Sequence, residues 1–554
     1  MTPKNILFIM CDQLRHDYLG CGGHPSLRTP HIDALAARGV NFTRAYVQST
    51  ICGPSRMSAY TGRYVSSHGS TQNGVPLRVG EPTMGDHLRA AGLRTALSGK
   101  THMVADIEGM ARLGIDPASV IGVAVSECGF EPFDRMDGLY PPELPQDRPS
   151  YETYLRENGF DGDDPWQDWA ASAEDDAGER LNGWLLSHAD KPARVPEAHS
   201  ETTYTTRRGI DFIQEAEVAG IPWCLHLSYI KPHWPYIAPA PYHSLYGAQD
   251  VPPVVRRDAE RTDPHPVYEA FMQERFARVF DNPAVRERVI PAYMGLIRQI
   301  DDQLGHLFAF MKEAELFDRT LIVFTSDHGD YLGDHWMGEK YLFHDCSARV
   351  PMIVVDPDAA ADATRGTTCD LLVEMIDLAP TFLDFVGAAP KPHVLEGRSL
   401  LPLTRGPVPP GGSWRKVAVS EYDYAFDAAR IRLGVAPADA WLTMLTDGRW
   451  KYVHAPGFRP MLYDLHTDPQ ELRDLGADPA HSAEIGRLRD AHFDWLRGLR
   501  RRITLPDAAI TRDDDVLLAF DPALPAGILI GYWDEAELAE EQEKMAAALR
   551  GRRT

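Results

Sequence analysis

The stretch NILFIMCD, residues 5–12, is a run of apolar and β-branched residues that ends in an aspartate. A strand that is buried on both faces of a parallel sheet has this composition. Amphipathic helical patterns separate it from similar runs at residues 94–100, 221–233, 319–330 and 350–355. Strands that alternate with helices predict an α/β fold with a large mixed, mostly parallel sheet flanked by helices.

Reactive side chains follow four of these predicted strands. They are Asp12, Lys100 with His102, Lys231 with His233, and Asp327 with His328. Ligands of open α/β sheets bind beyond the carboxyl ends of the strands. We therefore expect the functional site at this edge of the sheet.

The composition excludes several classes of protein. The chain has 554 residues and a formal net charge of −24, so its far field repels nucleic acid and anionic membranes, and we expect neither as a partner. The N-terminal apolar run is too short for a signal peptide, and no stretch reaches the roughly 18 apolar residues that a membrane span needs. Seven cysteines without a C-x-x-C spacing indicate neither a disulfide framework nor a zinc ribbon. We expect a cytoplasmic protein with a local anion site.

Changes in composition divide the chain into three parts. They are a catalytic α/β domain at residues 1–410, a smaller C-terminal α+β subdomain with a small antiparallel sheet and a helix at residues 411–502, and a tail at residues 503–554. A Pro- and Gly-rich stretch marks the first boundary, and Asp447-Gly448 predicts a hairpin in the subdomain. We expect the tail to contact a second copy in a homo-oligomer, a dimer or a tetramer.

Residues 137–196 are rich in Asp, Glu, Pro, Gly and Trp and show only weak periodicity. This pattern predicts an irregular insertion, and we expect it to wall the entrance of the active site.

The segment ICGPSRMSAYTGR, residues 51–63, places a cysteine just before a short helical pattern. Pro54 suits a first helical turn and Gly62 suits the residue after the last, which predicts a helix over residues 54–61. Cys52 then lies at the positive end of the helix, with Arg56 on the same face. The guanidinium of Arg56 has the planar shape that binds an oxyanion. A buried thiol before an ordinary helix and a thiolate of low pKa both fit this pattern.

The spacing C-x-P-S-R followed by T-G-R resembles the signature of the type I sulfatases. Further segments resemble other blocks of that family, in the family's order, at residues 12–23, 29–46, 98–102, 231–236, 324–335 and 462–475. The resemblance covers roughly residues 4 to 500. It implies an alkaline-phosphatase-like fold and the hydrolysis of sulfate esters.

The resemblance also implies a modification of Cys52. In that family a separate formylglycine-generating enzyme oxidises the signature cysteine to formylglycine. The hydrated aldehyde offers two hydroxyls, of which one, activated by a divalent cation, attacks the sulfur of the ester. The other, once deprotonated, collapses to the aldehyde and expels sulfate, so the covalent sulfo-enzyme hemiacetal does not persist.

The metal ligands that the resemblance implies are Asp12, Asp327, His328 and the modified Cys52. The family commonly has two adjacent aspartates at the first strand and Asp-Asn at the later one, whereas this chain has Cys11-Asp12 and Asp327-His328. Fewer carboxylates and one nitrogen ligand leave calcium, manganese and zinc open. A histidine after the aspartate is typical of the phosphonate monoester hydrolase branch.

Four more residues match family positions around the sulfate: Lys100, His102, His233 and Lys340. Fixed cations there stabilise the charge that builds on the ester oxygens. The resemblance makes His102 the base that collapses the hemiacetal, and either His233 or Lys340 the acid that protonates the leaving alcohol. Asn73 either donates a hydrogen bond to the substrate or forms an Asn-Gly turn.

The sequence leaves three functions open. The first is hydrolysis of sulfate monoesters, aryl or small alkyl, which Lys100 and His102 favour. The second is hydrolysis of phosphonate monoesters or phosphodiesters at the same site, which His328 favours, because these small anionic esters also carry one negative charge. The third is a non-catalytic family member that binds an anion or a partner.

Overall fold

The computed structural model describes residues 4–138, 150–406, 414–511 and 533–551. The predicted boundary at residue 410 lies outside the described residues. Two compact units are present, the first spanning residues 1–390 and 395–499 and the second residues 391–394 and 500–554. The second unit contains α17 (Asp507–Thr511) and α19 (Glu535–Gly551).

The first unit is built on an eight-stranded sheet. Its strands, in spatial order, are β12 (Thr367–Cys369), β2 (Val40–Phe42), β11 (Met352–Val355), β9 (Thr320–Ser326), β1 (Asn5–Asp12), β8 (Trp223–Pro232), β4 (Arg94–Gly99) and β5 (Glu131–Arg135). The five strands from β9 to β5 are parallel, and β11 runs antiparallel to β9. The prediction of a large mixed, mostly parallel sheet is therefore confirmed.

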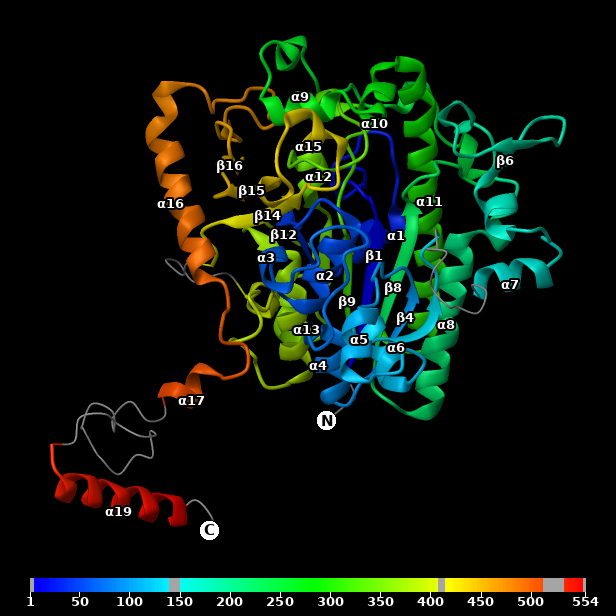
Figure 1. Ribbon diagram of the computed structural model, residues 1–554. Coiled ribbons are helices and arrows are strands. Elements are labelled where there is room, and N and C mark those ends of the chain that lie inside the picture. Colours follow the sequence, from blue (N-terminus) through cyan, green and yellow to red (C-terminus); the bar gives the residue numbers. More distant parts are fainter. Residues whose placement is uncertain (1–3, 139–149, 407–413, 512–532, 552–554) are drawn as a thin grey trace. The chain divides into compact units, whose positions relative to one another are not determined.

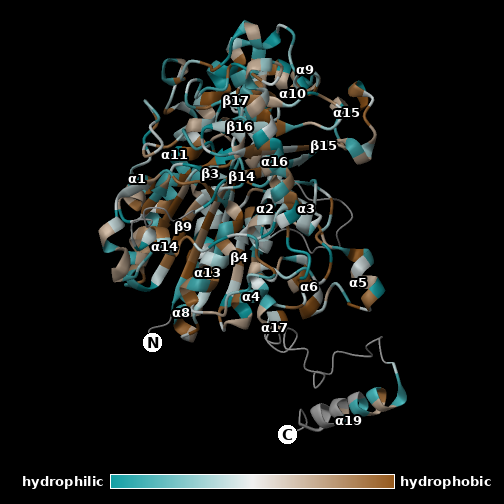
Figure 2. Cartoon of the chain, turned by 90° about the vertical axis from the view of Figure 1, so that its left-hand side faces the viewer, coloured by the Kyte–Doolittle hydropathy of each residue, from teal (hydrophilic) through white to brown (hydrophobic). Residues whose placement is uncertain are grey.

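Strand β1 is buried along its whole length because helices cover both faces of the sheet (Figure 1). Leu7 and Ile9 belong to one apolar core, together with residues of α1 (Pro30–Ala36), α8 (Glu201–Ala219) and α11 (Pro283–Glu313). Phe8 and Met10 belong to the other, together with residues of α2 (Cys52–Thr61), α4 (Met84–Ala90) and α13 (Leu378–Val386). Figure 2 shows the strands around β9 as predominantly apolar. The alternation follows from the period of two of a strand.

Helix α2 rests on two buried histidines. His226 on β8 stacks on Phe8, with ring centroids 4.4 Å apart, and its Nε2 lies 2.8 Å from the hydroxyl of Tyr60 on α2. Ser58 on α2 lies 2.9 Å, Oγ to Nε2, from His68. These contacts fasten the helix that begins at Cys52 to the sheet and to the following segment.

A four-stranded antiparallel sheet forms the predicted smaller C-terminal part. Its strands are β14 (Ala418–Asp423), β15 (Trp441–Thr446), β16 (Trp450–His454) and β17 (Met461–Asp464). Asp447-Gly448 lies in the turn of the β15–β16 hairpin, as predicted, and α16 (Ser482–Gly498) packs against this sheet. A three-stranded sheet joins β10 (Arg349–Val350), β3 (Ala45–Tyr46) and β13 (Val373–Glu374).

The insertion is more regular than its sequence predicts. Its described part contains α7 (Ser150–Glu157), a π-helical turn at Trp166–Ala170, and the hairpin of β6 (Ser172–Glu174) and β7 (Arg180–Asn182). These elements enclose an apolar core of their own. Elements this short show little periodicity, which is why the prediction of an irregular segment is wrong for this part.

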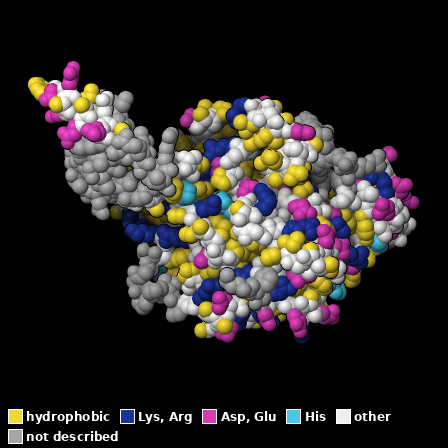
Figure 3. Space-filling model, turned by 90° about the horizontal axis from the view of Figure 1, so that it is seen from below, with side chains coloured by type: hydrophobic (Ala, Val, Ile, Leu, Met, Phe, Trp, Pro, Cys, Tyr) yellow, Lys and Arg dark blue, Asp and Glu magenta, His cyan; other side chains and the backbone are white. Residues whose placement is uncertain are grey.

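The remaining α-helices are short. They are α3 (Val65–His68), α5 (Ile107–Leu113), α6 (Val120–Ser126), α9 (Pro266–Met272), α10 (Arg275–Arg278), α12 (Asp345–Ala348), α14 (Leu401–Thr404) and α15 (Ala428–Leu433). Among the described residues, no helix has the length and apolar character to cross a membrane. Acidic and basic side chains are interspersed on the face seen in Figure 3.

Candidate active site

Strands β9, β1, β8 and β4 are neighbours in the sheet, so their carboxyl ends meet at one edge. The register pairs Cys11 with Ser326, which places Asp12 beside Asp327. Lys100 and His233 follow β4 and β8 at the same edge. The sheet therefore brings residues of all four predicted strands together, except that Lys231 pairs with Glu201 away from the cleft.

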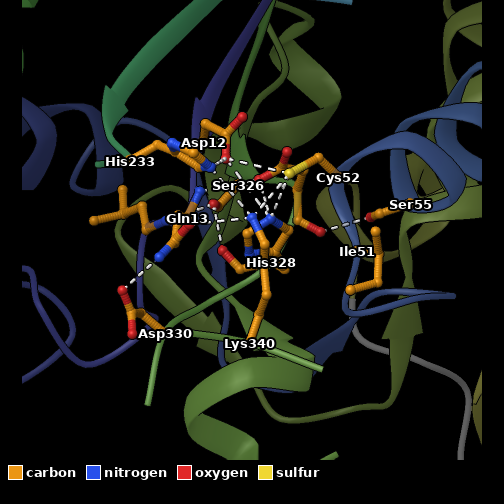
Figure 4. Close-up of polar contacts among 12 residues, drawn as sticks. Asp12, Gln13, Ile51, Cys52, Ser55, His233, Ser326, His328, Asp330 and Lys340 are labelled. Carbon is orange, nitrogen blue, oxygen red and sulfur yellow. Dashed lines mark hydrogen bonds and ion pairs between the residues drawn. The ribbon is translucent and has the colours of Figure 1, made fainter. Parts of the chain in front are cut away.

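Cys52 is the first residue of α2, which starts two residues earlier than predicted and ends at Gly62, where φ is 65°. Its Sγ lies 3.1 Å from Lys340 Nζ, 3.1 Å from His328 Nε2 and 3.7 Å from Asp12 Oδ1 (Figure 4). Burial raises the pKa of the Cys52 thiol, but the nearby cations, Lys340 first, outweigh burial and hold that pKa well below its ordinary value. The thiol thus occupies a position made for an anion.

Asp12, Cys52, Asp327 and His328 present ligand atoms that all lie within 4.8 Å of one another. The Nε2 of His328 is 3.6 Å from Asp12 Oδ1 and 3.7 Å from Asp327 Oδ1. On the other side of the ring, Nδ1 lies 2.9 Å from the carbonyl oxygen of Gly329, which can only accept a hydrogen bond. With its proton on Nδ1, the neutral form of the ring would turn the lone pair of Nε2 toward the two carboxylates, as in metal-binding histidines. Two carboxylates and one imidazole fit a hard or borderline dication.

Arg56 does not take the role that the sequence predicts. Its Nε donates to Asp327 Oδ2 at 2.8 Å and its Nη2 to Asp12 Oδ2 at 3.3 Å. Its Nη1 donates to the carbonyl oxygen of Lys100 and to Ser228 Oγ. The guanidinium is fully buried and does not line the cleft, so the oxyanions that it binds are these two carboxylates and not an oxyanion of the substrate. Arg56 binds the Oδ2 atom of each aspartate, and the Oδ1 atom of each aspartate faces His328.

Lys340 and His233 form a pair beside Cys52. Lys340 Nζ lies 3.3 Å from His233 Nε2 and 3.2 Å from Gln13 Oε1. Burial lowers the pKa of His233 to about 4, whereas the charge of Cys52 raises the pKa of Lys340 despite burial. His233 Nδ1 lies 2.8 Å from the carbonyl oxygen of Trp234 and donates to it. Lys340 is thus the protonated member of the pair and donates to His233 Nε2.

Lys100 forms an ion pair with Asp12, and His102 lines the cleft together with Cys52. The backbone of His102 has φ of 54°, in the left-handed region. Asp137 stabilises this turn, since its Oδ1 accepts the backbone N–H groups of Thr101 at 3.0 Å and His102 at 3.2 Å.

Asp137, Gln13 and Asp330 are functional candidates that the sequence did not reveal. Asp137 follows the edge strand β5, a short segment whose proline obscures its strand pattern. The backbone N–H of Gln13 donates to Asp327 Oδ1 at 3.0 Å and its side chain to Asp330 Oδ2 at 2.6 Å. Gln13 directly follows the aspartate that ends a strand, and this position could have identified it as a candidate.

Asn73 lines the cleft, and its Oδ1 accepts the backbone N–H of Gly53 at 2.8 Å. It therefore fastens the first turn of α2. That it also donates to the substrate stays a prediction.

The cleft above Cys52 has a volume of about 450 Å³. We define the charged floor as Cys52, Lys100 and Lys340, which line the cleft, together with Asp12, Asp327 and His328, which are buried beneath them. The outer lining of the cleft includes Trp166 and Trp184 of the insertion and Trp234 after β8. The prediction that the insertion walls the entrance is confirmed for these residues.

Comparison with known proteins agrees with this geometry. Residues 4–388 match the Sulfatase family, and residues 333–494 match the C-terminal region of N-sulphoglucosamine sulphohydrolase. The multifunctional alkaline phosphatase superfamily protein PehA of Trinickia caryophylli is 32% identical over 519 residues, which cover 89% of this chain and 95% of that protein. The arylsulfatase of Clostridium perfringens is 27% identical over 508 residues, or 90% of this chain and 95% of that enzyme.

Solved structures give the same result. The phosphonate monoester hydrolase of Silicibacter pomeroyi has a TM-score of 0.78 and 30% identity, covering 91% of this chain and 97% of its own. That of Agrobacterium radiobacter has a TM-score of 0.74 and 28% identity, covering 89% and 95%. The chain therefore belongs to the sulfatase family, within the alkaline phosphatase superfamily.

Proposed function

We propose that the protein is a formylglycine-dependent, metal-assisted hydrolase of sulfate monoesters that acts in the cytoplasm. The observation that carries this proposal is the convergence of Cys52 with Asp12, Asp327 and His328 beneath a cleft. A structural thiol packs among apolar side chains, whereas Cys52 contacts a lysine, a histidine and a carboxylate.

The described residues fit both groups that the family implies. A divalent cation held by Asp12, Asp327 and His328 would supply positive charge that eases deprotonation of a neighbouring hydroxyl. Formylglycine at residue 52 would supply that hydroxyl, where the thiol now faces those three residues.

The roles of the surrounding residues follow from their charges. Lys100 and Lys340 bind the oxygens of the ester, where negative charge builds. Lys340 holds a proton and contacts His233 Nε2, so we assign the proton for the leaving oxygen to Lys340, with His233 as its neutral partner. His102 is the base that removes the proton from the second hydroxyl of residue 52.

The second candidate activity is hydrolysis of phosphonate monoesters or phosphodiesters. The likeness to two solved phosphonate monoester hydrolases favours it. Steady-state kinetics with 4-nitrophenyl sulfate and 4-nitrophenyl phenylphosphonate compare the sulfatase and phosphonate hydrolase activities on substrates with the same leaving group. A higher kcat/KM for the sulfate supports the order proposed, and a higher kcat/KM for the phosphonate reverses it.

Mass spectrometry of the peptide that carries Cys52 tests the mechanism. In protein produced together with a formylglycine-generating enzyme, we expect an aldehyde at residue 52. Removal of the metal with a chelator should abolish hydrolysis, and calcium, manganese or zinc should restore it, which also identifies the ion. An unmodified thiol in fully active protein contradicts the proposal, and absence of any hydrolysis by the modified, metal-loaded protein supports a non-catalytic role.

We also propose that residues 503–554 contribute to a homo-oligomer. Light scattering of the full chain and of a chain truncated after Leu505 tests this. A lower mass per particle, beyond the mass removed, is expected for the truncated chain, and an unchanged oligomeric state contradicts it.

A further inference from the structure

Three tryptophans form one side of the cleft, and we call Trp166, Trp184 and Trp234 the aromatic wall. The rings of Trp166 and Trp184 have centroids 6.0 Å apart, and those of Trp184 and Trp234 are 5.4 Å apart, both pairs edge to face. Trp234 also packs on His233, at 4.2 Å between centroids. The wall therefore begins beside His233, which the proposed function places next to the proton donor, and continues through Trp184 to Trp166.

Each indole N–H of the wall already has a partner within the protein. Trp166 Nε1 donates to Glu201 at 2.6 Å, Trp184 Nε1 to Gln167 at 2.7 Å, and Trp234 Nε1 to Glu339 at 2.7 Å. The wall consequently offers carbon surface and ring faces to a ligand, not hydrogen-bond donors. A hydroxyl-rich leaving group such as a sugar would lose its hydrogen bonds to water there without replacement.

Further apolar side chains, Met103, Val104, Ile230 and Phe276, line the cleft, beside the polar side chains of Asn73, Arg135, Asp137, Glu339 and Tyr341. A cleft of about 450 Å³ lies within the range of roughly 300–1,000 Å³ that accommodates drug-sized ligands. A sulfate group with a single small ring leaves much of this space unfilled.

We propose that the preferred substrate is the ester of a flat, apolar phenol with two fused rings, and that Trp184 determines this preference. The inference rests on the proposed function. It follows from the aromatic wall, because flat rings gain both apolar burial and edge-to-face contacts against tryptophan. Trp184 comes from the insertion, whereas the charged floor comes from strand ends, α2 and the loop that carries Lys340.

The test compares 2-naphthyl sulfate with 4-chlorophenyl sulfate, whose phenols have similar acidity. We expect kcat/KM to favour the naphthyl ester by about tenfold or more, the discrimination typical of added apolar contact in a pocket. In Trp184→Ala this preference should fall toward unity, with the 4-chlorophenyl ester changed by less than about threefold. Trp184→Phe should retain most of the preference.

A matched control is Trp169→Ala, in the same insertion. Its Nε1 donates to the carbonyl oxygen of Asp161 and its ring packs on Phe160, away from the cleft lining. Equal loss of the naphthyl preference in Trp169→Ala and Trp184→Ala would overturn the role of Trp184, because disturbance of the insertion would then explain it.

The outcomes separate the two proposals. Hydrolysis of both esters without a naphthyl preference overturns the inference and leaves the proposed function standing. Hydrolysis of neither sulfate, nor of the corresponding phenylphosphonate esters, overturns the proposed function and the inference with it.

Discussion

The charged floor and the aromatic wall are built from different kinds of chain segment. Asp12, Lys100 and Asp327 lie at the ends of buried parallel strands, and Arg56 holds both carboxylates from below. Trp184 lies in an insertion of short elements with an apolar core of its own. A change in the floor leaves a buried charge without its partner, whereas a change at Trp184 removes one hydrogen bond to Gln167 and otherwise alters apolar surface and shape. If the proposed roles are correct, chemistry and leaving-group selection should vary independently in this molecule.

The largest effect is expected for Cys52→Ala. Loss of the nucleophile should reduce kcat on the order of 10⁶-fold for every ester tested. Cys224→Ala is the matched control, since Cys224 is a buried thiol within β8 and should retain wild-type kcat. Retained hydrolysis in Cys52→Ala would mean that the floor does not carry the chemistry.

Lys340→Met should lower kcat/KM by about 10²- to 10⁴-fold for phenyl sulfate, because the leaving oxygen loses its proton donor. The loss should be smaller for 4-nitrophenyl sulfate, whose leaving group needs less protonation. A plot of rate against leaving-group acidity for both proteins measures the difference. Equal losses for the two esters would mean that Lys340 binds the substrate but does not donate the proton.

Arg56→Met should lower the free energy of unfolding by about 3–5 kcal/mol, since it leaves the buried carboxylate of Asp327 without its arginine and that of Asp12 with Lys100 alone. Urea unfolding followed by circular dichroism measures it. Arg94→Met is the control, because Arg94 pairs with Glu131 and Glu215 near the surface, where such pairs contribute about 1 kcal/mol or less. Similar losses of unfolding free energy in the two variants would contradict the idea that substitutions in the charged floor are costly because its charges are buried.

Asp137→Ala should give the smallest effect, about a tenfold loss of kcat, below the roughly 10²-fold that a 1 Å displacement of a catalytic group can cost. Asp137 lies where the insertion begins, yet its carboxylate holds the backbone of His102. Asp137→Asn keeps an acceptor oxygen and should restore most of the activity. If both variants lose the naphthyl preference instead of kcat, Asp137 belongs with the wall.

Much of the charged floor could be predicted because its signals are local. Asp12 and Asp327 end apolar runs, and Cys52 precedes a helix with a clear stop at Gly62. The alternation of strands and helices then places these ends at one edge of the sheet.

The orientation of Arg56 could not be predicted, because its partners, Asp12 and Asp327, are distant in the sequence and only the fold brings them within reach of its side chain. Strand β5 escaped notice for a related reason, since it lies at the edge of the sheet and includes Pro132. The role of Trp184 could not be predicted, since the insertion has no regular hydrophobic pattern that would indicate which of its residues face the cleft.

The two histidines beneath α2 make the molecule sensitive to acid. Burial lowers the pKa of both His226 and His68 to about 3, whereas an exposed histidine titrates near 6.5. Between about pH 6.5 and pH 3 these histidines are protonated in the unfolded chain but neutral in the folded chain. The free energy of unfolding therefore falls as the pH drops through this range, by up to about 1.4 kcal/mol per pH unit for each ring. Mild acidification should therefore destabilise the part of the fold that supports Cys52.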